Sequence, residues 1–213
     1  MKKIILALDI NNKEKALKLV SDMSPYIDLF KVGPILFLKE GKEIIKMIKG
    51  LGKEVFLDLK FHDIPATVQR SVESAKELGV YSLTVHSSGG REMLYAASSV
   101  ANRPKIWAVT VLTSHKAKTE EIAKKALFAK ECGLDGVIAS PLEIEEIKKV
   151  CGKDFTVVTP GIRTEKIDDD QKRIATPASA VKAGADFIVI GRPIIEAQNP
   201  IEVAKKISEE IEK

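Results

Sequence analysis

The chain reads Glu54-Val55-Phe56-Leu57-Asp58-Leu59-Lys60-Phe61-His62-Asp63-Ile64-Pro65 at the point that decides its fold. An apolar run here ends on charged residues, and a helix-forming segment follows almost at once. The run predicts a strand over Glu54–Lys60, and the segment predicts a helix over Thr67–Leu78. Together they predict one βα unit.

The same unit recurs along the whole chain. Its apolar runs are rich in Ile, Val and Leu without alternation, as in strands that are covered on both faces. The expected strands are Ile4–Asp9, Leu29–Val32, Glu54–Lys60, Ser82–His86, Ile106–Leu112, Gly136–Ala139, Thr156–Thr159 and Phe187–Ile190. The expected helices are Lys13–Asp22, Leu36–Lys49, Thr67–Leu78, Arg91–Ala101, Thr119–Glu131, Leu142–Val150, Ala178–Ala183 and Ile201–Glu212. Glycines suited to a left-handed helix cap follow several of them, at Gly50, Gly79, Gly133, Gly152 and Gly184.

Eight such units in 213 residues predict a closed (β/α)8 TIM barrel that forms a single domain over residues 1–213. A doubly wound open sheet is the alternative, but it would usually contain fewer strands. The active sites of such barrels lie at the carboxyl ends of the strands. The polar residues that close each apolar run are therefore the candidates for function.

The composition narrows the class of protein. The net charge is +4, but the 34 basic and 30 acidic residues are interleaved, so no basic face for nucleic acid is expected. The two cysteines, Cys132 and Cys151, form no C-x-x-C pair and cannot supply a zinc site. The chain has no apolar run of transmembrane length, and its N-terminus reads as a strand rather than a signal peptide. We expect a cytoplasmic protein that is not bound to membranes.

Four charged residues close the first three strands. Alternation places Asp58 and Lys60 on the same face of their strand, pointing into the barrel mouth, and Lys31 and Asp9 end the neighbouring strands. One interpretation is a structural ion pair between Asp58 and Lys60. The other is a functional charge array, which is favoured because four inward charges exceed what the architecture needs.

A second candidate region closes the seventh and eighth strands. Pro160 and Arg163 follow the seventh strand, and Gly191 and Arg192 follow the eighth and open a short helix. Glycine allows close backbone approach, helix-terminal amides donate to anions, and guanidinium groups match phosphate oxygens. An isolated Gly-Arg pair is more often a solvated surface feature, but two arginines together favour a phosphate site. The polar stretch 162–173 is interpreted as a lid over the mouth, or alternatively as a plain connector.

The segment Asp58-Leu59-Lys60-Phe61-His62-Asp63-Ile64-Pro65 resembles the D-x-K-x-x-D-I-P signature of the orotidine 5′-monophosphate decarboxylase family. Further segments resemble the family in its order along nearly the whole chain. These are 6–9, 31–33, 85–87, 111–114, 159–163, 170–171 and 191–194.

The resemblance implies a homodimer with two shared sites that converts orotidine 5′-monophosphate (OMP) to UMP and CO2 without a metal or organic cofactor. It implies that Lys60 protonates C6 of the pyrimidine and that Asp58 lies beside the departing carboxylate. The remaining implied roles are ribose binding and charge orientation by Asp9 and Lys31, reach into the partner's site by Asp63 and Thr67, substrate contact by Ile64 and Pro160, pyrimidine contact by Thr113, and phosphate binding by Arg163, Gln171, Gly191 and Arg192.

Two other functions remain open. One is a Mg²⁺-dependent sugar-phosphate enzyme of the same barrel type, similar to 3-keto-gulonate 6-phosphate decarboxylase or hexulose 6-phosphate synthase. Those enzymes typically place a carboxylate where Lys31 stands, and a lysine there repels a divalent ion. The other is a nucleotide-binding barrel without catalysis, which would need Arg163 and Arg192 but not Asp58, Lys60 and Asp63 together.

Overall fold

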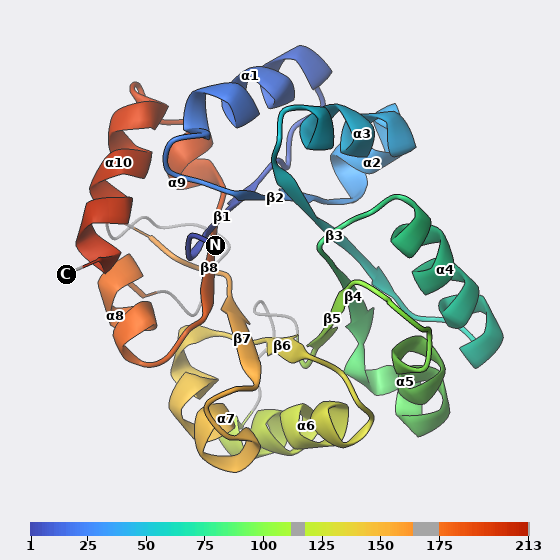
Figure 1. Cartoon of the computed structure of the whole chain (residues 1–213). Coiled ribbons are helices and arrows are strands. Elements are labelled where there is room, and N and C mark those ends of the chain that lie inside the picture. The colour runs from blue at the N-terminus through green and yellow to red at the C-terminus, as the bar shows by residue number, and fades with distance from the viewer. Residues whose placement is uncertain (112–117, 164–174, 213) are drawn as a thin grey trace.

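Eight parallel strands close into a barrel in the computed structural model, which describes residues 1–111, 118–163 and 175–212. Each strand pairs with the next in sequence, and β8 pairs with β1. The strands are β1 (Ile4–Ala7), β2 (Leu29–Val32), β3 (Glu54–Phe61), β4 (Ser82–His86), β5 (Lys105–Val109), β6 (Gly136–Ile138), β7 (Thr156–Thr159) and β8 (Phe187–Ile190). Figure 1 shows these strands at the centre of the molecule with the helices around them. The predicted (β/α)8 barrel is confirmed.

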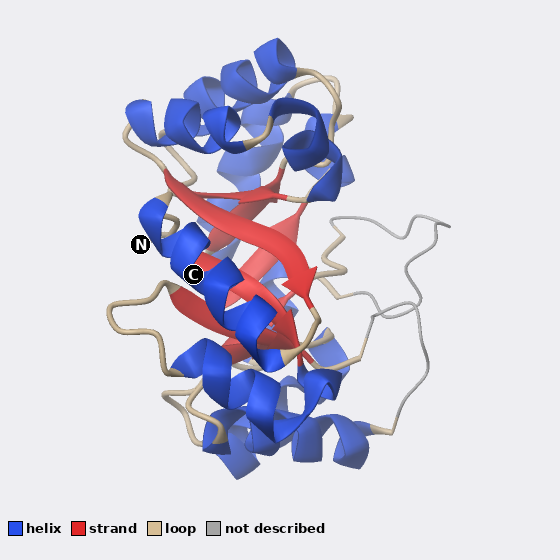
Figure 2. Cartoon of the chain, turned by 90° about the vertical axis from the view of Figure 1, so that its right-hand side faces the viewer, coloured by secondary structure: helices blue, strands red, loops and turns tan. Residues whose placement is uncertain are grey.

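Helices cover the outside of the barrel, as the side view in Figure 2 also shows. The α-helices are α1 (Lys13–Met23), α2 (Pro34–Glu40), α3 (Lys42–Gly50), α4 (Pro65–Glu77), α5 (Gly90–Ser98), α6 (Thr119–Glu131), α7 (Ile144–Cys151), α8 (Pro177–Lys182), α9 (Arg192–Ile195) and α10 (Pro200–Ile211). Short 3-10 turns, η1 (Ser87–Gly89) and η2 (Pro141–Glu143), precede α5 and α7. Several helices start with proline in the first turn, where its missing N–H costs no hydrogen bond.

One helix that was predicted as continuous is interrupted in the structure. The expected helix Leu36–Lys49 is two helices, α2 and α3, that meet at Gly41. Gly41 has φ 60°, a left-handed conformation that ends α2, and its N–H donates to the Phe37 carbonyl at 2.7 Å. The expected cap at Gly50 was also wrong, because Gly50 belongs to α3 and the left-handed residue is Gly52.

The strand predictions differ from the structure only at the ends. Four strands, β2, β4, β7 and β8, have the predicted bounds. β1 ends at Ala7 rather than Asp9, β6 ends at Ile138, and β3 continues to Phe61. β5 covers Lys105–Val109 instead of Ile106–Leu112, and Leu112 lies outside the described residues.

Two apolar layers hold the barrel together. The inner layer fills the barrel around Trp107 and Phe56, whose ring centroids lie 4.7 Å apart in an edge-on arrangement. The outer layer joins the opposite faces of the strands to the helices, and it includes Leu57 and Val85 of the strands and Val68 and Val72 of α4. Because both faces of each strand are buried, the strands read as continuous apolar runs.

Aspartates just ahead of three even-numbered strands bind the start of the preceding strand in the barrel. In each case one Oδ atom accepts a hydrogen bond from a backbone N–H, and a Lys or Arg pairs with the same carboxylate. The three sets are Asp28 with Lys2 N (3.0 Å) and Lys53, Asp135 with Ile106 N (2.8 Å) and Arg103, and Asp186 with Val157 N (2.7 Å) and Lys148. These carboxylates lie at the amino ends of the strands, away from the predicted site.

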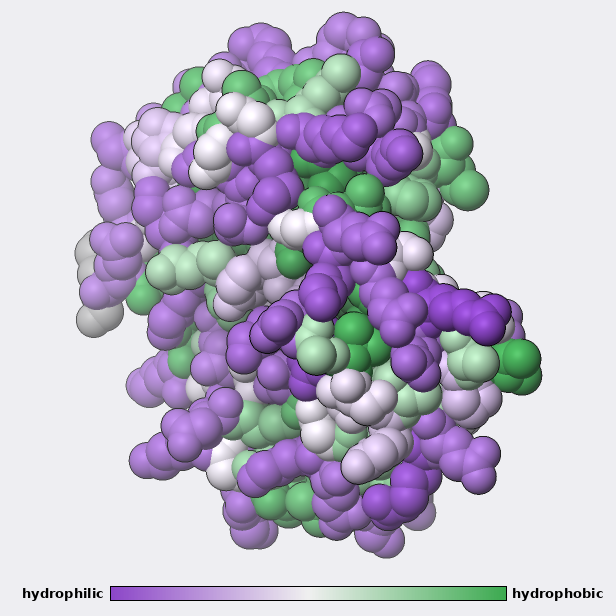
Figure 3. Space-filling model, turned by 45° about the vertical axis from the view of Figure 1, so that its right-hand side comes forward, coloured by the Kyte–Doolittle hydropathy of each residue, from purple (hydrophilic) through white to green (hydrophobic). Residues whose placement is uncertain are grey.

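One face of the molecule is mainly hydrophilic. Figure 3 shows one face, on which hydrophilic side chains predominate and apolar ones lie between them. Within the described ranges, none of the helices combines the length and the apolar character that crossing a membrane requires.

Candidate active site

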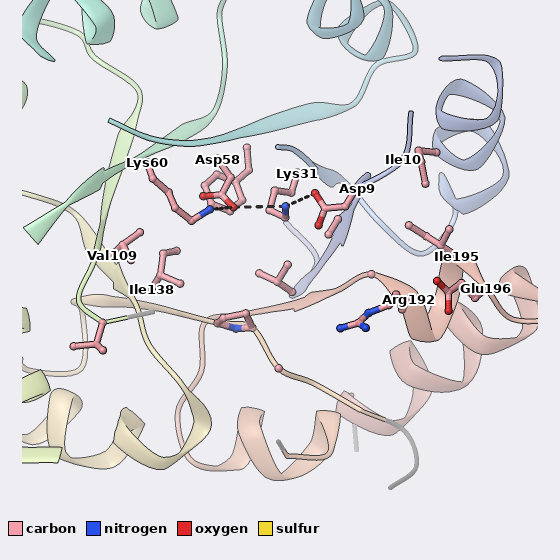
Figure 4. A pocket seen from close by; sticks show the side chains of 17 residues that line it. Asp9, Ile10, Lys31, Asp58, Lys60, Val109, Ile138, Arg192, Ile195 and Glu196 are labelled. Atoms are coloured by element: carbon pink, nitrogen blue, oxygen red, sulfur yellow. Dashed lines mark hydrogen bonds and ion pairs between the residues drawn. The ribbon is translucent and has the colours of Figure 1, made fainter. Parts of the chain in front are cut away.

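Four charged side chains form a continuous array across the carboxyl ends of β1, β2 and β3. Lys31 Nζ lies 2.7 Å from Asp9 Oδ1 and 3.6 Å from Asp58 Oδ2. Lys60 Nζ donates to the same Asp58 oxygen at 2.9 Å. Figure 4 shows the array as a chain of contacts from Lys60 through Asp58 and Lys31 to Asp9. Positive and negative charges therefore alternate along the rim.

Asp58 is the buried centre of this array, with a side chain that is 12% exposed. Burial opposes its ionisation, but the charges of Lys31 and Lys60 and the hydrogen bonds from Lys60 and Thr84 outweigh burial. The pKa of Asp58 therefore lies below its ordinary value, and its carboxylate stays charged. An ionised carboxylate at this position repels any second anion placed beside it.

Lys60 reaches the array through an irregularity in β3. The pairing of β3 with β4 runs through Leu57↔Leu83 and resumes only at Phe61↔Val85. Lys60 itself has φ 53°, which is uncommon for a residue other than glycine. Bulges of this kind redirect side chains next to active sites. Lys60 does face the mouth with Phe56 and Asp58, as alternation predicts, but through a bulge rather than a regular strand.

The opposite rim of the mouth carries the second candidate region. Gly191 follows β8 and caps the single-turn helix α9, which begins at Arg192. Pro160 and Gly161 follow β7. Figure 4 places Arg192 across the cavity from the charge array.

A cavity of about 450 Å³ joins the two regions, which suits a small molecule. Its walls combine polar groups at the two rims with apolar side chains between them. The lining residues are Ala7, Asp9, Ile10, Lys31, Phe56, Asp58, Lys60, Val109, Val111, Ile138, Pro160, Gly161, Val189, Gly191, Arg192, Ile195 and Glu196.

The structure brings most of the predicted site residues to this cavity and leaves others away from it. Those at the cavity are Asp9, Lys31, Asp58, Lys60, Pro160, Gly191 and Arg192. Asp63, Ile64 and Thr67 are exposed and do not line it. Arg163 is buried and is not among the lining residues, and its Nη1 donates to the Ile162 carbonyl at 3.0 Å. Thr113, Gln171 and most of the expected lid 162–173 lie outside the described residues.

The apolar wall was not predicted. Val109, Ile138 and Val189 line the cavity together with Ile195 and Glu196, which lie at the end of α9. The first three are the inward residues near the carboxyl ends of β5, β6 and β8, so alternation carried strand by strand would have found them. Thr84, which hydrogen-bonds both Asp58 and Lys60, was also missed.

The described residues contain no group of three or more His, Cys, Asp or Glu side chains that could hold a metal ion. Where two carboxylates of the site approach each other, the Lys31 ammonium lies between them.

Known proteins resemble this chain over almost its full length. The family model described as "Orotidine 5'-phosphate decarboxylase / HUMPS family" matches residues 2–207. A protein of Geobacter sp. strain M21 and one of Syntrophomonas wolfei, both named orotidine 5′-phosphate decarboxylase, are 46% and 48% identical. Each alignment covers 99% of this chain, and it covers 96% and 98% of those proteins respectively.

Solved structures agree with the sequence comparison. The orotidine 5′-phosphate decarboxylase of Lactobacillus acidophilus superposes with a TM-score of 0.85 at 35% identity, over 100% of both chains. The enzyme of the same name from Pyrococcus horikoshii OT3 gives a TM-score of 0.85 at 32% identity, over 99% of both chains. From these matches we conclude that the chain belongs to the orotidine 5′-phosphate decarboxylase / HUMPS family.

Proposed function

We propose that this chain decarboxylates OMP to UMP and CO2 in pyrimidine biosynthesis, in the cytoplasm. The observation that carries the proposal is the array of Asp9, Lys31, Asp58 and Lys60 in a cavity whose far rim holds Arg192. The family also contains sugar-phosphate enzymes, as its description indicates, but relatives at 43–48% identity are named orotidine 5′-phosphate decarboxylase.

Lys60 is the proposed acid. When the bond between C6 and the carboxylate carbon breaks, CO2 leaves and the electron pair remains on C6. The Lys60 ammonium then donates a proton to C6, which gives UMP, and it regains a proton from solvent. An ammonium fixed by Asp58 at 2.9 Å stabilises the developing negative charge without reorganisation.

Asp58 and Lys31 support this step from either side. The buried, ionised Asp58 would lie beside the substrate carboxylate and favour its departure by repulsion. Lys31, held between Asp9 and Asp58, would orient both carboxylates and bind the ribose together with Asp9. The apolar wall of Val109 and Ile138 would cover the face of the pyrimidine and exclude water.

The phosphate would bind on the other rim. Arg192 offers a guanidinium fork, and Gly191 allows the phosphate to approach the backbone. Pro160 lies at the cavity beside them, and we keep Arg163 and Gln171 as further proposed phosphate ligands and Thr113 as the proposed pyrimidine contact. Because the phosphate is remote from the bond that breaks, its binding energy can orient the ring.

A Mg²⁺-dependent sugar-phosphate reaction is the second candidate, because the family description names HUMPS beside the decarboxylases. The position of Lys31 argues against it. Its Nζ lies 2.7 Å from Asp9 and 3.6 Å from Asp58, so a cationic group already bridges the two carboxylates that a metal would need. Simple nucleotide binding without catalysis would not require this array.

We further propose a homodimer in which each site is completed by the partner. Asp63 and Thr67 are exposed at the start of α4 and do not reach their own cavity. Ile64 between them is 66% exposed, and Ile35 and Leu38 of α2 are 53% and 84% exposed. Exposed apolar side chains on two adjacent βα units are typical of an interface. Burial of this surface would carry Asp63, Ile64 and Thr67 toward the partner's site.

The activity is tested by following pyrimidine absorbance during incubation with OMP in the presence of EDTA. We expect turnover, and we expect Lys60→Ala to bind UMP but to turn over negligibly. No change in absorbance with the unmodified chain would overturn the proposed activity. Turnover of a sugar phosphate that requires Mg²⁺ would favour the second candidate, and normal activity of Lys60→Ala would remove Lys60 as the acid.

The shared site is tested separately by mixing inactive Lys60→Ala chains with inactive Asp63→Asn chains. A hybrid dimer would contain one site with both native residues if Asp63 acts across the interface, so activity should return. Subunit exchange is verified by mass, and absence of recovery after verified exchange would refute the placement of Asp63.

A further inference from the structure

Thr84 of β4 connects the two central residues of the charge array. Its Oγ1 donates to Asp58 Oδ1 at 2.9 Å and accepts a hydrogen bond from the Lys60 backbone N–H at 2.9 Å. The directions follow from the chemistry, because an ionised carboxylate can only accept and a backbone N–H can only donate. The same hydroxyl group thus donates one hydrogen bond to Asp58 and accepts another from Lys60.

The Thr84 hydroxyl fixes the orientation of the Asp58 carboxylate. Lys60 and Lys31 both approach Oδ2, at 2.9 Å and 3.6 Å. Thr84 holds the other oxygen, so the carboxylate is restrained from both sides and cannot rotate freely about its last torsion. Because Thr84 is fully buried, water does not replace the hydroxyl if it is lost.

The same hydroxyl supports the unusual backbone at Lys60. Regular pairing between β3 and β4 is interrupted between Leu57 and Phe61, and Lys60 adopts φ 53° inside this interruption. A non-glycine residue in this region is strained by roughly 1–3 kcal/mol and persists only when its surroundings enforce it. The Thr84 side chain supplies the Lys60 N–H with an acceptor where the regular strand pairing is broken.

We infer that Thr84 is a positioning residue for the decarboxylation, acting through Asp58 and Lys60 and not by contact with the substrate. Thr84 is fully buried and is not among the described residues that line the cavity. The expected effect of Thr84 on the rate of decarboxylation rests on the proposed function. The geometric part of the inference, the joint restraint of Asp58 and Lys60, does not depend on the substrate.

The charged surroundings determine what the loss of the hydroxyl would change. Asp58 faces Lys31 from β2, Lys60 from β3 and Thr84 from β4, with Asp9 beyond Lys31. Near Lys60, the rings of His62 and His86 stack with centroids 5.5 Å apart, and the pKa of His86 is lowered by burial, by His62 and by Lys60. Removing a donor from the ionised Asp58 raises its pKa, because the charged form loses a stabilising hydrogen bond.

The test compares Thr84→Val, which keeps the side-chain shape, with Thr84→Ser, which keeps the hydroxyl. Thr84→Val should lower kcat about 10- to 100-fold, the usual effect of losing a hydrogen bond to a charged group. KM should change less, because the phosphate rim is untouched. The acidic limb of the pH profile should move to higher pH. Thr84→Ser should stay within about threefold of the unmodified chain.

A matched control is available just past the end of the next strand, β5. Thr110 is also buried, and its hydroxyl donates to the Ile138 carbonyl at 3.1 Å without contacting Asp58 or Lys60. Thr110→Val should therefore lose a similar amount of stability with little loss of kcat. Thr84→Ala provides a second variant without the hydroxyl. It separates the loss of the hydroxyl from any poor packing that is specific to valine.

The outcomes separate the inference from the proposed function. If the unmodified chain does not turn over OMP, the proposed function fails. If the unmodified chain does turn over OMP, two results overturn the inference. One is that Thr84→Val keeps the kcat and the pH profile of the unmodified chain. The other is that Thr84→Ser and Thr110→Val lose as much kcat as Thr84→Val. A crystal structure of Thr84→Val tests the geometry whatever the activity. A rotated Asp58 carboxylate or a changed φ at Lys60 supports it, and an unchanged site refutes it.

Discussion

Substitution of Gly33 by alanine should damage the charge array without damaging the fold. Gly33 follows β2 and caps the start of α2 with φ −95°, a conformation that alanine adopts readily. An added Cβ would lie 2.8 Å from Asp9 Oδ1 and 3.2 Å from Lys31 Nζ. Both atoms are the ends of flexible side chains, so the new methyl displaces the array and not the backbone.

The size of the effect follows from these distances. Asp9 Oδ1 would have to retreat by about 0.6 Å or more to reach ordinary van der Waals contact with the methyl. The bond between Lys31 and Asp9, now 2.7 Å, would then lengthen beyond the range of a good hydrogen bond. Because the Asp9 side chain is 47% exposed, solvent reduces the loss to about 1 kcal/mol. We expect kcat/KM for OMP to fall about fivefold to tenfold, with the free energy of unfolding changed by less than about 1 kcal/mol.

The assay measures kcat/KM by pyrimidine absorbance and stability by denaturant unfolding at the same pH and salt. Gly50→Ala is the control, because a Cβ there meets nothing within 4 Å and Gly50 belongs to α3. That variant should keep full activity and gain up to about 1 kcal/mol in stability. The reasoning is refuted if Gly33→Ala has the kcat/KM of the unmodified chain, or if its crystal structure keeps the Asp9 to Lys31 distance.

Three further predictions concern separate parts of the barrel. Arg192→Ala should raise KM for OMP about 10- to 100-fold and weaken UMP binding far more than uridine binding, which equilibrium titration of both ligands checks; equal losses would contradict a phosphate contact. Because the pKa of Asp58 is lowered, its ionisation stabilises the fold fully above the ordinary value of 3.8, and this contribution is lost as the pH falls below 3.8 through the lowered value. Asp58→Asn should therefore flatten the fall in unfolding free energy at acid pH, and an unchanged slope would count against the assignment. Asp186→Ala should lower the free energy of unfolding by about 1–3 kcal/mol, because the Val157 N–H loses its acceptor, while kcat stays the same. A loss of kcat without a loss of stability would contradict that structural role.

The sequence predicted best those elements whose position depends on a single factor, the burial of apolar residues. β2, β4, β7 and β8 have the predicted bounds because their apolar residues must be buried on both faces. The break at Gly41 was missed because the apolar period continues from α2 into α3, and only the backbone reveals that Gly41 is left-handed. The cap was predicted at Gly50 instead of Gly52 for the same reason, because both glycines come at the end of the same apolar pattern and only the backbone shows which one is left-handed.

The sequence predicted which charged residues meet at the mouth, but not the geometry that brings them together. Asp9, Lys31, Asp58 and Lys60 were placed at the mouth from the strand ends alone, and they do meet there. Alternation along a regular strand predicted the correct face for Lys60. It did not predict the bulge that turns Lys60 toward the mouth, because a bulge depends on the pairing of two strands. Thr84 was missed because its role is a cross-strand contact that no local pattern encodes.

The position of these aspartates relative to their apolar runs separates carboxylates that bind the backbone from carboxylates that line the cavity. Asp28, Asp135 and Asp186 precede their strands, and each accepts a hydrogen bond from the backbone of a neighbouring strand. Asp9 and Asp58 lie at the other end, after or late in their strands, and each contacts a lysine at the cavity. The physical reason is the parallel sheet, which sends every strand's amino end to one rim and every carboxyl end to the other. A carboxylate ahead of a strand thus meets unpaired backbone N–H groups, which it can satisfy alone. A carboxylate at the carboxyl end meets the open mouth, so the charge it retains is available to a ligand.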